Sequence, residues 1–388
     1  MNFLLVALLS IGHASCARPG SRYPEDATDI LAKQGLRNLE KYLKRNPAQG
    51  GCSIETATKR YEWGDLSAHE RKDYIDAVLC LQALPPTSDP TVVPGARSRF
   101  DDFVGVHIQM SGSVHATANF LTWHRYFTWL YEKALREECG YRGYQPYWNW
   151  GRYASDPIHS PIFDGTETSM SGNGLYSPYD GVTFPLYPPP YNILPASEGG
   201  GCVTTGPFAN MTVNLGPVFP GLPDVPPNPQ ADGLGPNPRC LRRDINVHAA
   251  RETTTNYTES LIVNSNNVYW FQTTMNGRAE LGQWGVHTSG HFTIGGDPGG
   301  DFFVSPGDPA FYLHHGQIDR VYWIWQLLDL ENRLSDVGGT ITPANSPPSR
   351  NGTLDDVLDL GVLGEAVRLG DALDTVGGVG GKFCYVYV

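Results

Sequence analysis

The sequence predicts a mainly α fold in which a four-helix core is wrapped by long loops rich in proline and glycine. Several segments repeat apolar residues at helical spacing. The stretch from about 152 to 250 holds too many prolines and glycines to continue a helix or a central strand. No linker and no internal repeat divides the 388 residues, so we expect one large domain.

The first predicted helices lie in the N-terminal third of the chain. Ser67 followed by Glu70 has the spacing of a capping box at the start of a helix over 67–82. A second helix is expected within 96–109. The clearest helix covers 118–141, where apolar side chains and a histidine recur at i, i+4, i+7 and i+11.

A further helix is predicted for the segment DPAFYLHHGQIDR, residues 308–320. Asp308 can cap this helix, and Pro309 fits its first turn, where the missing N–H costs nothing. One face of the helix carries Phe311, His315, Ile318 and Tyr322. A histidine is an unusual residue on such a face, because a buried imidazole needs partners for its nitrogens.

The N-terminal sequence MNFLLVALLSIGHASCA has an apolar run followed by small residues. This pattern is typical of a secretory signal peptide, residues 1–17, cleaved near Cys16 or Ala17. The mature domain would then be 18–388. No later segment is apolar for long enough to span a bilayer, so we expect a secreted, soluble protein.

The cysteine count agrees with an oxidising compartment. Seven cysteines occur, and removal of Cys16 leaves an even number. Many connectivities are open to them. From the expected proximity of the elements we favour three pairs: Cys202–Cys240, Cys80–Cys139 and Cys52–Cys384. Three sequons, at Asn210, Asn256 and Asn351, are candidate glycosylation sites. The net charge of −12 argues against nucleic acid and anionic membranes as partners.

The histidines form two groups. Eleven histidines occur in the chain. The first group is His107, His115 and His124, and the second is His287, His291 and either His314 or His315. His287 and His291, four residues apart, share a helix face as two ligands of one metal would. His115 and His124 are half a turn out of phase, so we expect His115 in the loop or first turn before the helix of His124.

Such histidines also have a plain structural explanation. A single HxxxH pair, or one histidine on an apolar helix face, is more often a hydrogen-bonded core residue than a ligand. Two separate groups of three are harder to explain in this way, because burying six imidazoles is unfavourable unless each nitrogen has a partner. Ligation by nitrogen alone suits copper, and zinc less well. Facing helices of a bundle are a natural place for a two-metal site.

These motifs together resemble one known family. The histidine at 107, the histidine at 115, FLTWHR at 120–125, HTSGH at 287–291 and DPAFYLHHGQIDR at 308–320 resemble the type-3 dicopper proteins: tyrosinases, catechol oxidases and haemocyanins. The resemblance runs from about residue 67 to 388, and both copper motifs are long and specific. The final CYVY is similar to the Tyr-x-Tyr element that closes the family's core domain, as in a short fungal-type enzyme without a shielding domain.

The resemblance implies two copper ions. His107, His115 and His124 would hold the first, and His287, His291 and His315 the second. The family places a ligand at the eighth position of its Asp-Pro motif, which selects His315, and helical phase agrees. His314 lies about 100° away and is expected to be a packing residue. Asp319, one turn beyond, is either an acceptor for the N–H of a ligand or an ordinary ion-pair partner of Arg320 or another neighbour.

Several positions depart from the family's pattern. Many relatives have a cysteine, thioether-linked to the second histidine, where Ser113 stands here. Thr288 occupies the position where strong monophenol hydroxylases often have asparagine. Gln283 or Glu280 stands in for the family's acidic water-orienting residue. Phe302 resembles the aromatic gate of some catechol oxidases, although it would also suit the core of its glycine-rich loop. Phe292 is a second aromatic residue expected near the opening.

The function implied is oxidation of o-diphenols to o-quinones, with O2 reduced to water; monophenols or o-aminophenols are further substrate candidates. The partners are therefore a small phenol and O2. The alternative is reversible O2 binding, as in haemocyanins, by the same six histidines in a site closed to phenols. A zinc hydrolase is disfavoured because no glutamate adjoins the HxxxH pair to act as a general base.

Overall fold

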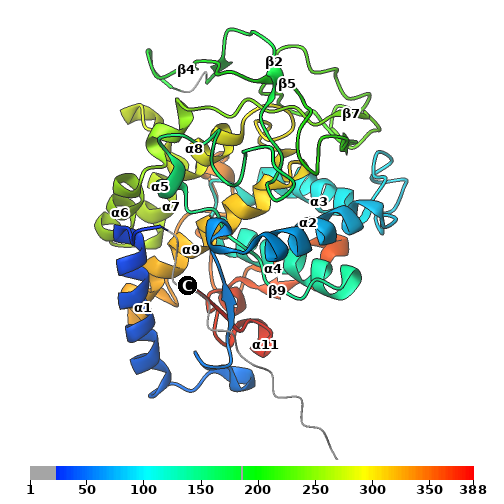
Figure 1. Cartoon of the computed structure of the whole chain (residues 1–388). Coiled ribbons are helices and arrows are strands. Elements are labelled where there is room, and N and C mark those ends of the chain that lie inside the picture. Colours follow the sequence, from blue (N-terminus) through cyan, green and yellow to red (C-terminus); the bar gives the residue numbers. More distant parts are fainter. Residues whose placement is uncertain (1–22, 185–186) are drawn as a thin grey trace, which may run out of the picture.

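The structure, a computed structural model, describes residues 23–184 and 187–388. The predicted signal peptide lies outside the described residues. Helices build the body of the molecule, and the green segment around β2, β4, β5 and β7 lies over them at the top of Figure 1. This arrangement confirms the predicted mainly α fold with a helical core and long covering loops.

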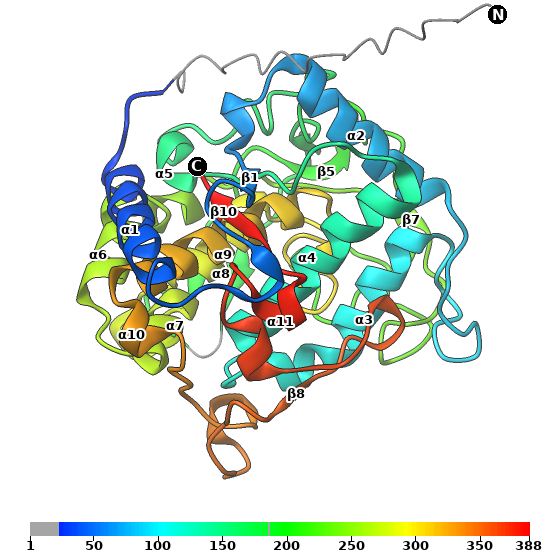
Figure 2. The ribbon, with the colours of Figure 1, turned by 90° about the horizontal axis from the view of Figure 1, so that it is seen from below.

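The helices of the described residues are α1 (Ala27–Leu43), α2 (Ala68–Ala83), α3 (Arg99–Val114), α4 (Phe120–Cys139), α5 (Trp150–Tyr153), α6 (Thr255–Asn264), α7 (Val268–Asn276), α8 (Gly285–Ile294), α9 (Ala310–Leu328), α10 (Leu330–Arg333) and α11 (Gly378–Gly381). Helix α4 packs on α2, α3 and α9, and α8 packs between α7 and α9. Figure 2 shows α4, α8 and α9 in the middle of the molecule, with α1 and α6 to one side. The core helices therefore come from distant parts of the sequence.

Local capping explains where several of these helices begin. The predicted capping box is confirmed at α2, where Ser67 Oγ and the backbone N–H of Glu70 bond and the Glu70 carboxylate accepts from the N–H of Ser67. Helix α1 was not expected from the apolar pattern. It also starts with a capping box, formed by Asp26 and Asp29, and it packs along α9.

The strands are short and pair in twos: β1 (Thr58–Arg60) with β10 (Tyr385–Tyr387), β2 (Gly174–Tyr176) with β5 (Gly200–Val203), β3 (Val182–Thr183) with β4 (Ile193–Leu194), β6 (Thr212–Val213) with β7 (Arg239–Cys240), and β8 (Val357–Leu358) with β9 (Val367–Arg368). Only β1 and β10 pair in parallel, with Lys59 opposite Val386. This pair brings the two ends of the described chain together.

Disulfides hold the periphery to the core. All three favoured pairs are confirmed: Cys52–Cys384, Cys80–Cys139 and Cys202–Cys240. The first closes a loop of more than three hundred residues and reinforces the β1–β10 contact. Among the described residues, no helix combines the length and the apolar character that a bilayer crossing requires.

Candidate metal centre

Two groups of buried histidines meet where α3, α4, α8 and α9 face one another. His107 lies on α3, His115 immediately follows α3, and His124 lies on α4. The second group comprises His287 and His291 on α8 with His314 and His315 on α9. Within each group, one nitrogen from each residue lies within 4.8 Å of the others. The expected loop position of His115 is confirmed.

The first group is oriented by backbone carbonyls. The Nδ1 atoms of His107, His115 and His124 lie 2.7, 3.1 and 2.8 Å from the carbonyl oxygens of Phe303, Ser111 and Phe120. A carbonyl oxygen only accepts, so each Nδ1 carries the proton and each Nε2 keeps its lone pair. The Nε2 atoms of His107 and His124 are buried without a partner among the described residues. These atoms fit a metal ion as their missing partner.

The second group brings three Nε2 atoms together. The Nε2 of His291 lies 3.1 Å from that of His287 and 3.2 Å from that of His315. Three ring nitrogens this close need a common partner, and a metal ion supplies one. His315 is held by stacking on Phe311, with ring centroids 4.0 Å apart, while its Nδ1 is buried without a partner among the described residues.

His314 is occupied in a different way. Its Nδ1 accepts the indole N–H of Trp150 at 3.0 Å, and its Nε2–H donates to the carbonyl oxygen of His287 at 3.1 Å. Both ring nitrogens are therefore used by the protein. Gly290 makes room for this ring, because a Cβ at that position would lie 2.1 Å from the Cε1 atom of His314. Neither Trp150 nor Gly290 was singled out by the sequence.

The two groups form one centre. The rings of His124 and His315 stack with centroids 4.8 Å apart and planes 22° apart. His115 and His287 also face each other, with centroids 6.4 Å apart. Six nitrogen donors and no carboxylate or thiolate match the preference of copper for imidazole in such sites.

Burial keeps these imidazoles neutral. Loss of hydration lowers the pKa of His107 to about 4 and that of His314 to about 3. The pKa values of the other five are also lowered by burial, and for these five neighbouring histidines lower them further: His115, His124, His287, His291 and His315. At neutral pH the lone pairs that a metal requires are therefore not blocked by protons.

A buried ion pair fixes the start of α9. Arg243 Nη2 lies 2.7 Å from Asp308 Oδ1, and the same oxygen accepts the backbone N–H of Ala310 at 2.9 Å. The expected capping role of Asp308 is thus found, with Arg243 as an additional partner. Arg243 also donates to the carbonyl of Met170, which attaches the covering loops to the histidine-bearing helix.

Asp319 is not an acceptor for a histidine N–H. Four side chains contact its carboxylate: Arg60 Nη1 at 3.3 Å, Arg125 Nε at 2.5 Å, Tyr385 Oη at 2.8 Å and Tyr387 Oη at 2.6 Å. Burial opposes ionisation, but Arg125 and Arg60 lower the pKa of Asp319. Of the two roles expected for Asp319, the hydrogen bond to a ligand is not found among the described residues, whereas an ion pair with neighbours is found, in a network one turn beyond His315. Arg320 pairs instead with Asp29.

The other predicted residues lie at different distances from the histidines. The ring of Phe302 is 4.2 Å from that of His115, centroid to centroid, and the residue is 44% exposed. The hydroxyl of Thr288 donates to the carbonyl of Asn276 at 2.7 Å. Phe292 packs against Phe184 at 4.6 Å rather than against a histidine.

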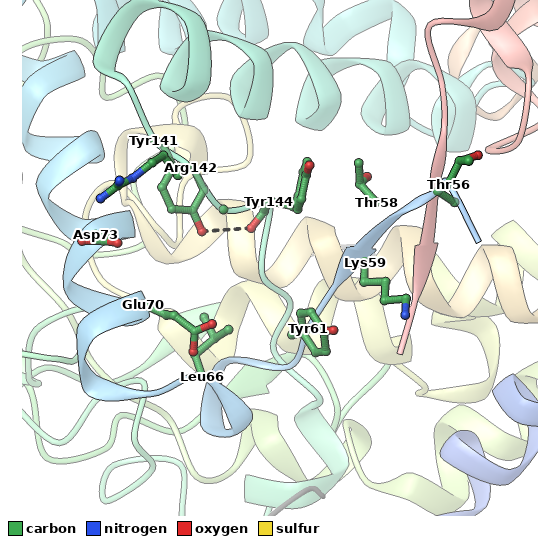
Figure 3. Close-up of a pocket in the computed structure, with 12 residues that line it drawn as sticks. Thr56, Thr58, Lys59, Tyr61, Leu66, Glu70, Asp73, Tyr141, Arg142 and Tyr144 are labelled. Carbon is green, nitrogen blue, oxygen red and sulfur yellow. Dashed lines mark hydrogen bonds between the residues drawn. The ribbon is translucent and has the colours of Figure 1, made fainter. Parts of the chain in front are cut away.

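Gln283 and Glu280 lie outside the histidine cluster. Both are exposed, and Gln283 lines a hollow at the start of α8 that none of the histidines lines. Glu280 pairs with Arg278. A separate hollow beside β1 is lined by Lys59, Tyr61 and Tyr141, among others (Figure 3). It contains no histidine, so it is not the metal centre.

Comparison with known proteins gives a consistent result. Residues 97–328 match the family described as the common central domain of tyrosinase. The chain is 44% identical over 310 residues to the tyrosinase-like protein orsC of Emericella nidulans, covering 77% of this chain and 82% of that protein. It is 38% identical over 336 residues to tyrosinase P of Aspergillus terreus, covering 84% and 91%.

Two further similarities extend this result. The chain is 38% identical over 357 residues to N-acetyl-6-hydroxytryptophan oxidase ivoB of Emericella nidulans, covering 87% of this chain and 93% of that protein. The structure is similar to that of a variant polyphenol oxidase from Thermothelomyces thermophila, with a TM-score of 0.86 and 44% identity over 93% of this chain and 97% of that chain.

Proposed function

Because this chain belongs to the tyrosinase family, and is thus a copper-dependent oxidase of phenols that uses O2, we propose that its preferred reaction is oxidation of o-diphenols to o-quinones. The family uses two copper ions, and the two histidine groups fit them. The observation that carries the proposal is the six-histidine centre with an exposed aromatic ring, Phe302, beside His115.

We propose His107, His115 and His124 as ligands of one copper ion and His287, His291 and His315 as ligands of the other. The orphaned Nε2 atoms of the first group and the three convergent Nε2 atoms of the second support this assignment. His314 is excluded as a ligand in this proposal because Trp150 and the His287 carbonyl use both of its nitrogens.

Copper, when bound, supplies the electron transfer between a diphenol and O2. The chain's own side chains do the rest. The backbone carbonyls fix the tautomers of the first three histidines, and burial keeps all six uncharged. The ring of Phe302 offers a face or edge on which the phenol can pack as it approaches.

We further propose that diphenols react faster than monophenols. A monophenol must lose its proton, which requires a base or an oriented water. The Thr288 hydroxyl already donates to Asn276, and Gln283 has no basic group, so neither side chain provides that base. Phe302 narrows the approach as well. A catechol is less demanding, because its two adjacent oxygens are deprotonated more easily.

Initial rates on a catechol and on the matching monophenol, with a trace of diphenol to remove the lag, test this preference. Equal or faster monophenol rates would overturn it and leave the copper assignment intact. Thr288→Asn is expected to raise the monophenol rate relative to the diphenol rate. An unchanged ratio would show that the control lies in other residues.

Reversible O2 binding is the alternative function. None of the relatives described above is an oxygen carrier by name. An absorption spectrum after addition of hydrogen peroxide tests the coupled copper pair, for which an intense near-ultraviolet band is expected. Addition of a catechol then separates the two functions, because a carrier would leave the phenol unchanged.

We propose that the protein is secreted, as a mature domain of residues 18–388. Three disulfides suit an oxidising compartment. The asparagines of the three sequons are exposed and thus open to glycosylation: Asn210, Asn256 and Asn351. Mass spectrometry of the protein from the culture medium tests cleavage after Cys16 or Ala17; an uncleaved chain retained in the cell would contradict the proposal.

A further inference from the structure

A large polar hollow lies beside the histidine centre. It is formed by α7, the segment 336–351 and the residue that follows His115, and its volume is about 790 Å³. The residues that line it are Ala116, Asn267, Tyr269, Gln272, Thr273, Asn276, Gly277, Asp336, Val337, Gly338, Gly339, Thr340, Ala344, Asn345 and Asn351. Nothing in the reaction proposed above uses this hollow.

No histidine lines the hollow, but a neighbour in sequence of each histidine group lines it or contacts its lining. Ala116 directly follows His115, and its carbonyl oxygen accepts the N–H of Ala344 at 3.0 Å. On the other side, the carbonyl oxygen of Asn276 accepts the hydroxyl of Thr288, the residue after His287. The hollow is thus connected to the residue after His115 and to the residue after His287, and a substituent on a ring held at the centre would extend toward it if it pointed this way.

The lining is rich in amides and has no cation. Side-chain amides come from Asn267, Gln272, Asn276 and Asn345, while Asn351 at the rim is a candidate glycosylation site, and no lysine or arginine lines the hollow. The one carboxylate, on Asp336, accepts the N–H of Val268 at 2.7 Å and so caps α7. The lining of the hollow is thus mainly hydrogen-bonding, with one negative charge on Asp336.

The side-chain oxygen of one of these amides, Gln272, lacks a hydrogen-bond partner among the described residues. Gln272 is only 5% exposed, and its Nε2 donates to the carbonyl of Gly338 at 2.7 Å. Its Oε1 is buried without a partner among the described residues. A buried acceptor without a partner is unfavourable, so this wall of the hollow holds one hydrogen-bonding group that the described residues leave unsatisfied.

Backbone strain is concentrated in the same walls. Five non-glycine residues of the described chain have positive φ, and three of them line this hollow. Their φ values are 52° at Ala116, 49° at Ala344 and 59° at Asn345. Strained conformations of this kind gather at ligand-binding segments, where the surrounding structure holds them in place.

We propose that this amide-rich hollow is a specificity subsite that binds a neutral, hydrogen-bonding substituent of the phenolic ring, of the carboxamide class. A carboxamide both donates and accepts, as the lining amides do. A carboxylate would meet Asp336 with no cation to balance it, and an alkyl chain would leave the amides unpaired. The proposal rests on the proposed function, since it assumes that the ring sits at the copper centre.

Matched catechols test the subsite with the copper-loaded enzyme. The probes share the ring and differ at the end of a two-carbon chain: N-acetyldopamine carries an amide, dopamine an ammonium, hydrocaffeic acid a carboxylate, and 4-ethylcatechol no polar group. The amide is expected to have the lowest KM, by about three- to tenfold, the size of one or two neutral hydrogen bonds. A lowest KM for the amine, the acid or the alkyl catechol would overturn the proposal.

Variants locate the effect within the hollow. The double variant Thr273→Val, Asn276→Leu removes polarity from its wall with little change in volume, and it is expected to abolish the preference for the amide. Thr274→Val is the matched control, because Thr274 lies on the same helix but lines the other hollow, at the start of α8. An amide preference that survives the double variant, or that disappears in the control, would contradict the assignment.

Binding measured without turnover separates the subsite from the reaction. N-acetylphenethylamine has no phenolic oxygen and cannot be oxidised. In saturation-transfer NMR with the copper-loaded protein, its acetyl protons are expected to be saturated, and this signal should fall in the double variant. Binding with no catechol oxidation would refute the proposed function alone. Absence of acetyl saturation, with catechols oxidised normally, would refute the subsite alone.

Discussion

The imidazole rings of the two histidine groups are oriented in different ways. The first, on α3 and α4, is oriented by hydrogen bonds from each Nδ1 to a backbone carbonyl. The second, on α8 and α9, is oriented by packing: His315 stacks on Phe311, and His287 lies parallel to His314 with planes 8° apart. The first histidine group is therefore held by hydrogen bonds to carbonyls. In the second group three ring nitrogens converge, and no such hydrogen bond orients them among the described residues.

Because of this difference, the geometry of the second histidine group depends on how α9 is held in place. Asp308 anchors the start of that helix through Arg243, and Asp319 anchors it one turn beyond His315 through Arg60 and Arg125. In the first group the carbonyls of Ser111 and Phe120 lie four residues from the histidines that they orient, and only that of Phe303 comes from a distant segment, whereas the ring packing of the second group depends throughout on how α8 and α9 are held relative to each other. The second group is thus expected to be the more sensitive to changes in distant residues.

Removing one proposed ligand from each group should give the largest effect. His124→Ala and His291→Ala are each expected to lower the copper content from two ions to one per chain and to reduce turnover to background. Atomic spectroscopy on purified protein measures the metal. Two retained ions in either variant, or zinc in a copper-replete preparation, would contradict the assignment of that group.

Disturbing the anchor of α9 comes next. Asp319→Asn leaves the buried guanidinium of Arg125 without a charge partner and leaves Arg60 paired with Glu132 alone, so we expect the free energy of unfolding to fall by about 3–5 kcal/mol. Denaturant titration measures it. We expect the second group to lose its copper ion before the first. Paramagnetic NMR can identify which group of histidines lies next to the remaining ion. An unchanged free energy of unfolding would contradict the proposal that the ion pairs of α9 hold the second histidine group in place.

Alanine variants of His314 and His315, which are adjacent on α9, are expected to differ in copper content and in activity. His315→Ala should lose the second copper ion. His314→Ala should keep both ions and lose about 10–100-fold in activity, as expected for a residue that acts through another. The reason is that His314 bonds Trp150 and the His287 carbonyl rather than pointing a free nitrogen at the centre. The reverse outcome would exchange the two roles.

Acidification of the metal-free protein tests the hydrogen bonds themselves. Burial lowers the pKa of His107 to about 4, although the Phe303 carbonyl opposes this shift, and burial and neighbouring histidines lower the pKa of His315 well below its usual value. In the unfolded chain both titrate near 6.5, so unfolding takes up protons below that pH. Stability should be full above pH ~6.5 and fall by about 1.4 kcal/mol per pH unit for each such histidine down to pH ~4.

The order of protonation distinguishes the two groups in the same experiment. NMR titration of the imidazole carbons should show His107 protonating before His315, because only His107 has a carbonyl that accepts from its protonated ring. Protonation of His315 first would mean that the packed group is the more open to water. Stability that is independent of pH in this window would contradict the burial of neutral histidines.

Much of the fold followed from local pattern. Ser67 and Glu70 predicted the start of α2, and the apolar positions around His124 predicted α4. Both predictions were possible because a capping box and a period of 3.6 residues depend only on residues that are close in sequence. Helix α1 was missed because its buried positions are few and small, including Thr28, Ala32 and Gly35. Its capping box at Asp26 was the signal available in the sequence.

The sequence identified the six proposed ligands through motif spacing and the family resemblance, whereas it left several disulfide connectivities open, of which the expected proximity of the elements favoured the three found. Helical phase and motif spacing depend on residue order alone, and they already separated His315 from His314. The same reasoning placed His115 in a loop. The helical phase of His315 and the loop position of His115 need no knowledge of what lies across the core.

Only the tertiary structure decided what those residues touch. Trp150 reaches His314 across 164 positions of sequence, and Arg125 reaches Asp319 across 194. The polar hollow likewise combines α7 with segments near residues 116 and 340. A hydrogen bond depends on distances of a few tenths of an ångström, and those are set when helices from distant segments pack. Periodicity gives the face on which a side chain lies, whereas its partner is chosen by that packing.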